Sequence, residues 1–585
     1  MMSYFKNALR DGRHAKWLFF FLTLLAGIFA LWPYNDFQFM LSTGDHGRDL
    51  YGFKKSLDGA LPIRDYSWLF GPVMPYYYGL FFRAFGISIQ SVLLGQNILI
   101  LATGIMLYLT GILFIPPTLA FVCAAWYWAY RGVEFFYTYN HSGALLCLVS
   151  VLYWLMRYIR QPQKAWVYGG SFALLGLLLI RINLGVSSMV AFFSSLMIID
   201  WAAKNPARGT MRRTYAGLIG ILLLITALVY GALLYGLPSY VLGQTFPFQK
   251  TYRTDITPGP AESLKAFWLT LVVNSTNDAG RIIIFVILAL SLLQTILSFH
   301  KGTIHKEDRL KLILVYGSIL FLILVTLHEF IASGVHYRLF WILPLFIILM
   351  FMIISSGTRA IPTPAIRLLI FVTLIMLPLT SLYQRTVLIR ILKQNPLSLL
   401  QFGPNKVYLQ SPVDVIRTVT HVSRFVQEHT GEGEKIFALP FDPLYYFLSG
   451  RDGATRQLMF FDHRNITLTQ ELDAIADLEK HQVRYILISN RAVSPQEHLG
   501  VLGETYCKTL YGYIQNHYRP VALYGPWNAP SGWGWNHAVK IYERVKDKKA
   551  ATDQNASQSP QPNLNEEICS AGPQETGRGQ QACEP

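Results

Sequence analysis

The sequence has 585 residues, of which 52% are hydrophobic and 14% are charged, and its mean hydropathy is +0.33. Soluble domains carry about a quarter of their residues as charges, so this composition excludes an ordinary soluble protein. The net charge of +16 comes from short basic clusters between apolar runs, a topology pattern of membrane proteins. We therefore predict a polytopic α-helical protein in a lipid bilayer, with no nucleic-acid partner.

The first apolar run covers residues 17–33 and follows the basic residues Lys6, Arg10, Arg13 and Lys16. It has no small-residue cleavage site after it, so it reads as a retained signal-anchor with the N-terminus in the cytoplasm. Residues 34–88 then form a first outer loop. Within it, the aromatic and proline-interrupted segment from Gly71 is expected to lie in the membrane interface, because crossing would place the later basic clusters outside.

Ten further apolar runs are long enough to span a bilayer, which gives about eleven transmembrane helices and places the C-terminal part outside. The further spans are predicted near 89–112, 117–131, 141–157, 165–183, 185–201, 214–237, 281–299, 310–327, 339–355 and 366–382.

From about residue 401 the composition becomes that of a soluble domain. Residues 412–429 have apolar positions at helical spacing, and residues 435–439 and 484–489 read as buried strands on either side of an amphipathic helix at 469–481. We predict three parts, which are a transmembrane module over 1–400, a small extracytoplasmic α/β domain over 401–546 and a polar, disordered tail over 547–585.

Two functional classes lose support from what the sequence lacks. No GxxxxGK[ST] motif is present, so the chain itself does not drive transport with ATP. The spans carry few charges near their middles, where transporters usually keep ionisable groups. Arg181 is the main exception, and it falls near the outer end of its span. A lipid or solute transporter and a non-catalytic glycolipid-binding protein stay open as alternatives.

The first outer loop concentrates the polar chemistry of the chain. It carries apolar residues at helical spacing, which predicts an amphipathic helix lying against the membrane. A solvated polar loop is the plain interpretation of its charges. Asp36 and Asp45, however, closely follow the first span, where an enzyme meets a lipid head group and an aqueous acceptor together. The acidic residues of the loop are Asp36, Asp45, Asp49, Asp58 and Asp65, interleaved with Arg48, Lys54, Lys55 and Arg64.

Residues 44–86 resemble the first outer loop of GT-C glycosyltransferases, the polytopic enzymes that use polyprenyl-phosphate-linked sugars, such as protein O-mannosyltransferases and lipid A aminoarabinose transferases. Residues 435–456 and the closing YGPW and VKIYER segments resemble the C-terminal domains of bacterial members. One departure is that several relatives have Asp-Glu where this chain has Asp45-His46. The residues that fit the loop pattern are Gly59, Pro62, Asp65, Gly71 and Pro72.

The resemblance implies an enzyme of the bacterial inner membrane that transfers a hexosyl or pentosyl group from a polyprenyl-phosphate donor to a glycan, lipid or protein acceptor. A carboxylate that removes the acceptor proton is the base of a single inverting displacement, with Asp45 as the first candidate and Asp36 as the second. Basic groups bind the leaving phosphate, although each of them has snorkelling to the interface as its alternative role. The candidates are Arg338, His336, Arg181, Lys54 and Lys55.

The remaining candidates belong to a substrate pocket. Aromatic rings stack on sugar faces and amides read hydroxyl groups, but a membrane-interface aromatic belt explains the tyrosines nearly as well. No cofactor is required. A divalent metal held by Asp36, Asp45 and His46 is an alternative to a polar substrate contact by His46. The pocket candidates are His46, Asp65, Tyr139, Asn140 and His141.

Overall fold

The chain divides into two units, Met1–Arg544 and Val545–Pro585. Only the first residue of the second unit lies within the described part, so the account below concerns the first unit. His336, Arg338, the predicted tail and most of the predicted span 281–299 lie outside the described residues. The computed structural model describes residues 12–38, 40–134, 139–203, 208–245, 292–293, 296, 306–328, 341–359, 363–385, 397–461, 466–493, 500–529, 531 and 536–545.

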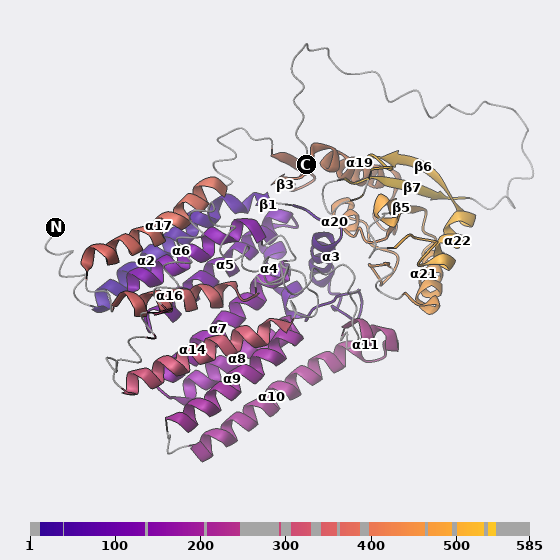
Figure 1. The fold of residues 1–585 in the computed structure, drawn as a ribbon. Coiled ribbons are helices and arrows are strands. Elements are labelled where there is room, and N and C mark those ends of the chain that lie inside the picture. Colours follow the sequence, from indigo (N-terminus) through magenta and orange to yellow (C-terminus); the bar gives the residue numbers. More distant parts are fainter. Residues whose placement is uncertain are drawn as a thin grey trace, which may run out of the picture. The chain divides into compact units, whose positions relative to one another are not determined.

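A bundle of long helices makes up the N-terminal part (Figure 1). Ten of the eleven predicted spans coincide with described helices, and six described helices are long and apolar enough to cross a membrane. The helices of the bundle are α2 (Gly12–Leu31), α5 (Ile89–Gly111), α6 (Pro117–Glu134), α7 (Asn140–Arg160), α8 (Lys164–Ile180), α9 (Ile182–Ala202), α10 (Arg208–Leu234), α14 (Lys306–Thr326), α16 (Leu343–Arg359) and α17 (Pro364–Arg385), with the short α11 (Ser239–Thr245) after α10.

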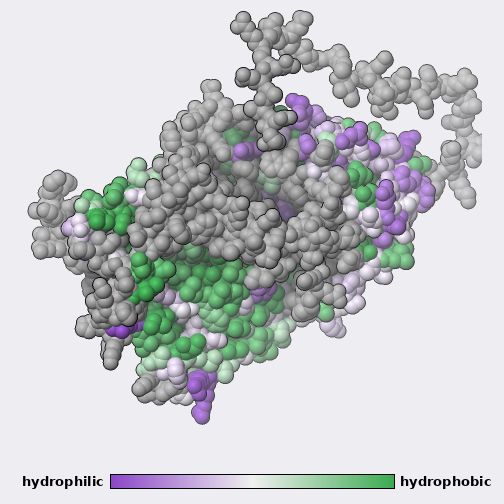
Figure 2. All heavy atoms as spheres, viewed as in Figure 1, coloured by the Kyte–Doolittle hydropathy of each residue, from purple (hydrophilic) through white to green (hydrophobic). Residues whose placement is uncertain are grey.

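The outer surface of the bundle is apolar, as expected of helices that face lipid. Phe172 is 80% exposed and Trp201 is 67% exposed, and α10 presents a row of exposed leucines. Figure 2 shows hydrophobic residues gathered over the helices, whereas hydrophilic and hydrophobic residues are mixed over the C-terminal part of the described chain. The composition of this surface confirms the prediction of a polytopic α-helical membrane protein.

The first loop folds into several short elements. A 3-10 helix η1 (Trp32–Asn35) and a two-residue strand β1 (Phe37–Gln38) come first, followed by α3 (Asp45–Leu57) and α4 (Val73–Phe85). Both predicted loop helices are therefore present. Leu50 and Phe53 on α3 are fully buried, and the Phe53 ring stacks on Tyr78 of α4 with 4.5 Å between ring centroids.

The C-terminal part contains a four-stranded sheet in the order β4-β5-β7-β6. β4 and β5 are parallel and the other neighbours are antiparallel, as the predicted strand–helix–strand unit requires. The elements predicted at 412–429, 435–439, 469–481 and 484–489 are present as α19 (Val413–His429), β4 (Phe437–Leu439), α21 (Leu468–Lys480) and β5 (Tyr485–Ser489). The region also contains α20 (Leu444–Ser449), η5 (Asn490–Val493), α22 (Lys508–His517), β6 (Tyr518–Tyr524) and β7 (Val539–Arg544).

A second, smaller sheet joins the two halves of the sequence, and sequence reasoning missed it. The hairpin β2 (Ser398–Phe402) and β3 (Asn405–Leu409) follows the bundle, and β1 of the first loop pairs with β3 in parallel. The backbone N–H of Tyr408 donates to the carbonyl of Asp36 at 2.9 Å. This pairing fixes the chain where it leaves α2 and so helps to place the residues that follow.

Candidate active site

The segment before α3 is shaped by its own polar groups. The Ser42 hydroxyl oxygen accepts hydrogen bonds from the backbone N–H groups of Gly44 and Asp45, each at 3.2 Å. The Ser42 N–H in turn donates to Nδ1 of His46 at 3.0 Å. A serine oxygen that satisfies the first free N–H groups of a helix favours its start at that point. Asp45 is thereby fixed as the first residue of α3.

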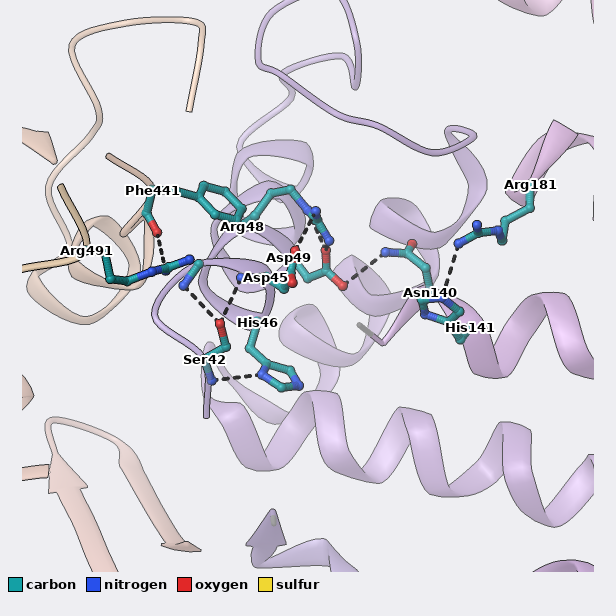
Figure 3. A network of polar contacts seen from close by, with 11 residues as sticks. Ser42, Asp45, His46, Arg48, Asp49, Asn140, His141, Arg181, Phe441 and Arg491 are labelled. Carbon is teal, nitrogen blue, oxygen red and sulfur yellow. Dashed lines mark hydrogen bonds and ion pairs between the residues drawn. The ribbon is translucent and has the colours of Figure 1, made fainter. Parts of the chain in front are cut away.

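Asp45 belongs to a buried ion-pair network on the first turns of α3 (Figure 3). Arg48 donates from Nη1 to Oδ1 of Asp45 at 3.0 Å, and from Nε and Nη2 to Oδ1 of Asp49 at 3.0 and 2.8 Å. The Asp45 side chain is 27% exposed, whereas those of Arg48 and Asp49 are 4% and 0% exposed. One oxygen of Asp45 is thus held by a cation, and its Oδ2 accepts no hydrogen bond from the described residues.

Asp49 connects this network to the helix bundle. Its Oδ2 accepts a hydrogen bond from Nδ2 of Asn140, the first residue of α7, at 3.0 Å. Burial raises the pKa of the Asp49 carboxyl to about 6, and the Arg48 charge opposes that rise. Asp49 therefore binds a proton more readily than an exposed carboxyl does, and its protonation weakens its ion pair with Arg48.

A second guanidinium lies beside the first because of a close backbone approach. The N–H of Gly71 donates to the carbonyl of Ile180 at 2.9 Å, at the end of α8. A Cβ at residue 71 would lie 1.9 Å from the carbonyl oxygen of Leu179, so only glycine fits there. The approach brings Phe70 next to Arg181, whose Cζ lies 5.0 Å from the centre of the Phe70 ring.

Phe70 is shared by both arginines. The Cζ of Arg48 lies 4.9 Å from the ring centre, so the two guanidinium carbons are at most 4.9 Å plus 5.0 Å apart. Arg181 also lies 5.0 Å from the ring of Trp341 and contacts Nε2 of His141 at 3.1 Å. Aromatic faces attract a guanidinium without neutralising it, so Arg181 brings a positive charge next to the network in which Arg48 is paired with Asp45 and Asp49.

Three predicted pocket residues lie within or beside this cluster. His46 packs against Tyr139 with 5.3 Å between ring centroids. The Tyr139 hydroxyl donates to Oε1 of Gln38 at 2.8 Å, and its ring is 1% exposed. Asn140 is fully buried and holds Asp49, and His141 contacts Arg181. The structure therefore brings His46, Asn140 and His141 together with Asp45, while the Tyr139 ring is already packed on protein.

Other predicted residues lie apart from the cluster in the described part of the chain. Lys54 forms an ion pair with Asp58, and Lys55 forms one with Asp452, each at 3.0 Å. Asp65 is exposed, and its Oδ2 accepts a hydrogen bond from the N–H of Leu61 at 2.7 Å. These partners account for all three side chains locally.

The second candidate base, Asp36, has an exposed side chain beside the small sheet. The structure does not group it with Asp45 and His46 in the way that a metal site requires. Within the described ranges no set of three or more His, Cys, Asp or Glu side chains is placed to hold a metal ion, so the metal alternative gains no support there.

Sequence reasoning missed two members of the network, Arg48 and Asp49, although both were visible in the acidic loop. Asp45, Arg48 and Asp49 are spaced i, i+3 and i+4, which places them on one face of a helix. That spacing was the available signal. Trp341 follows a break in the apolar pattern and had no such signal.

A small hollow opens beside Arg48. It lies between the first loop and the C-terminal part of the chain and has a volume of about 20 Å³, about the size that holds one water molecule. Its lining residues are Arg48, Ser67, Leu69, Phe441, Gln457, Leu458 and Met459.

Neither a protein-family model nor a curated protein matches the sequence. Among solved structures, the archaeal oligosaccharyltransferase AglB from Archaeoglobus fulgidus, in complex with an inhibitory peptide and a dolichol-phosphate, is similar over 88% of this chain and 74% of that chain. Its identity is 12% and its TM-score is 0.50. This chain has the GT-C fold. The fold predicted from the resemblance of the first loop is thereby confirmed.

Two further GT-C structures are similar with lower TM-scores. ArnT from Cupriavidus metallidurans, bound to undecaprenyl phosphate, has 10% identity and a TM-score of 0.48 over 90% of this chain and 97% of that chain. The arabinofuranosyltransferase AftD from Mycobacteria has 14% identity and a TM-score of 0.45, and the likeness covers 92% of this chain and 40% of that chain. At sequence identities this low, the similarity shows the fold alone.

Proposed function

We propose that this GT-C-fold protein is a membrane glycosyltransferase that moves a sugar from a polyprenyl-phosphate donor to an acceptor on the periplasmic face of a bacterial inner membrane. The observation that carries the proposal is the cluster in which a partly exposed carboxylate, Asp45, is held by Arg48, and Arg48 shares the Phe70 ring with Arg181. A base and an anion site side by side are what sugar transfer from a phosphate requires. The AglB structure with the same fold contains a dolichol-phosphate, a lipid of the proposed chemical class.

Asp45 is the proposed base. Its Oδ1 is fixed by Arg48 while its Oδ2 is open, so an acceptor hydroxyl can donate its proton to Oδ2. As that proton moves, the acceptor oxygen forms a bond with the anomeric carbon of the sugar. The bond from that carbon to the phosphate oxygen breaks on the opposite side, and the phosphate leaves with the electron pair. The configuration at the anomeric carbon is inverted in this single step.

Arg181 is the proposed ligand of the leaving phosphate, assisted by Arg48. Negative charge accumulates on the phosphate as the bond breaks, and a cation placed there in advance stabilises the transition state. Arg181 contacts the Phe70 and Trp341 rings and His141 beside the network, whereas Lys54 and Lys55 form ion pairs with Asp58 and Asp452 apart from it. We therefore rank Arg181 above the two lysines. His336 and Arg338 remain candidates outside the described residues.

The test uses the full-length protein in lipid nanodiscs with a panel of radiolabelled polyprenyl-phosphate sugars. Release of sugar to water or to an added acceptor, together with binding of polyprenyl phosphate, is the expected result. Donor binding without any turnover across the panel supports a non-catalytic glycolipid-binding protein and contradicts the proposal. Ion-gradient-dependent uptake of a solute or lipid in the absence of sugar release supports a transporter instead.

A further inference from the structure

Three buried polar residues at one edge of the C-terminal sheet lie next to the start of α3. Asp442 follows β4 after two residues, Ser489 is the last residue of β5, and Arg491 lies in η5 directly after it. Since β4 and β5 are parallel, their carboxyl ends lie at one edge of the sheet, the usual location of functional groups in α/β folds. All three residues are at most 3% exposed. Buried polar groups of this kind need partners.

Asp442 finds one of its partners in the first loop. Its Oδ1 accepts a hydrogen bond from the Thr43 hydroxyl and its Oδ2 accepts one from the Ser489 hydroxyl at 2.7 Å. The backbone adds a second link, because the N–H of Leu444 donates to the carbonyl of Thr43 at 3.0 Å. Thr43 is thus held on both its side chain and its backbone, two residues before Asp45.

Two glycines let the C-terminal part approach α3 this closely. A Cβ on Gly47 would lie 2.3 Å from the backbone nitrogen of Leu444, and one on Gly44 would lie 2.6 Å from the Phe441 ring. A contact below 3.0 Å forces the neighbouring atom to shift. The fit is therefore backbone against backbone at Gly47, whereas Gly44 packs against the Phe441 ring.

Arg491 places a positive charge among carboxylates at this junction. Its Nη1 donates to the carbonyl of Phe441 at 3.3 Å and lies 3.9 Å from Oδ1 of Asp442. Burial lowers the pKa of Arg491, while the negative charges of Asp442 and Asp45 act against that change. Figure 3 shows the hydrogen bond between Arg491 and the carbonyl of Phe441.

We propose that the C-terminal α/β part positions the base of the active site, with Asp442 acting through Thr43 and Arg491 holding residues 441 and 442. The inference rests on the proposed glycosyltransferase function and gives the C-terminal part a role in catalysis itself. Thr43, Asp442 and Arg491 are positioning residues, because none of them has to contact the donor or the acceptor.

The test compares Thr43→Val with Thr43→Ser in the full-length protein in nanodiscs. Valine keeps the shape of threonine and removes the hydroxyl, while serine restores it. The rate of hydrogen exchange of the backbone amides of residues 40–50 measures how firmly this segment is fixed, and it does not depend on enzymatic activity. We expect exchange in Thr43→Val to be about tenfold faster or more, with recovery in Thr43→Ser and no change in the surface variant Asp414→Asn.

Kinetics supply the second measurement. Misplacing a reacting group by about 1 Å lowers a rate on the order of 10²-fold, so we expect kcat to fall in Thr43→Val. The KM for the donor should stay within about threefold of wild type, because the substitution leaves the phosphate site unchanged. Thr43→Ser should recover kcat. Arg491→Lys should retain more of kcat than Arg491→Gln because it keeps the charge.

The two proposals fail in different ways. Unchanged exchange in both Thr43→Val and Asp442→Asn overturns the positioning role, whatever the activity. Faster exchange with an unchanged kcat overturns it as well. If the wild-type protein turns over no donor in the panel, the glycosyltransferase proposal fails and kcat loses its meaning, while the exchange measurement still decides whether the C-terminal part holds residues 42–45.

Discussion

Replacing Arg48 by methionine removes the cation at the centre of the network and tests the geometry of α3 directly. Arg48 makes three hydrogen bonds of 2.8 to 3.0 Å to two carboxylates. Asp49 is fully buried and would keep the hydrogen bonds from Asn140 and from the backbone of Tyr139, but no cation. Breaking a buried ion pair on one side costs about 3–5 kcal/mol of unfolding free energy, and we expect that loss at pH 7.5.

The loss should depend on pH. Asp49 has a folded pKa of about 6, above its ordinary value of 3.8, so the folded state binds that proton more tightly than the unfolded state does. Ionising Asp49 therefore lowers stability as pH rises through this interval, and removing Arg48 moves the folded pKa further up. We expect the destabilisation by Arg48→Met to be about 1–2 kcal/mol smaller at pH 5 than at pH 7.5.

The assay is equilibrium unfolding in mixed micelles followed by tryptophan fluorescence. Arg417→Met is the matched control, because Arg417 and Asp414 form the same i,i+3 pair on α19 with side chains 62% and 78% exposed. An exposed pair of this kind contributes about 0–1 kcal/mol. Equal effects of Arg48→Met and Arg417→Met, or an effect of Arg48→Met that does not change with pH, would refute the reasoning.

Three further predictions concern the same site. Arg181→Gln should weaken the binding of undecaprenyl phosphate about tenfold or more, with Arg181→Lys between it and wild type, measured by native mass spectrometry; equal affinities would remove Arg181 from the phosphate site. The rate of sugar transfer should fall at low pH with a midpoint near pH 6, where Asp49 becomes protonated and its ion pair with Arg48 weakens. Asp49→Asn should lower the rate and abolish this pH dependence. An unchanged pH dependence in Asp49→Asn contradicts the assignment. Gly47→Ala should destabilise the protein by about 1–3 kcal/mol because its methyl group would meet the backbone of Leu444, whereas Gly317→Ala, at a helix position with open space, should be neutral or stabilising.

Most of the fold could be predicted from patterns that are local in the sequence. The apolar runs had the length of membrane-spanning helices. The unit of β4, α21 and β5 followed from two short apolar runs and one helical periodicity, each contained in a single segment. The pairing of β1 with β3 joins residues about 370 positions apart, and a two-residue strand has no periodicity to detect. It could not have been predicted from one sequence.

The residues of the candidate site also differ in whether local sequence patterns could identify them. Asp45 and Arg181 stood out as polar groups beside apolar runs. Arg48 and Asp49 were recoverable from their helical spacing to Asp45, because i, i+3 and i+4 positions share a face. Asp442 and Arg491 follow strands about 400 residues later, and only the packing of Gly44 and Gly47 against residues 441–444 brings them to the same place.

The base assignment is the centre of the account, and one comparison tests it most directly. Single-turnover release of sugar from the best donor would be measured for wild type, Asp45→Asn and Asp36→Asn, with donor binding determined for each variant. We predict that Asp45→Asn loses release by about 10²-fold or more while binding is retained, and that Asp36→Asn stays near wild type. Retained release in Asp45→Asn, or its loss in Asp36→Asn alone, would contradict the account.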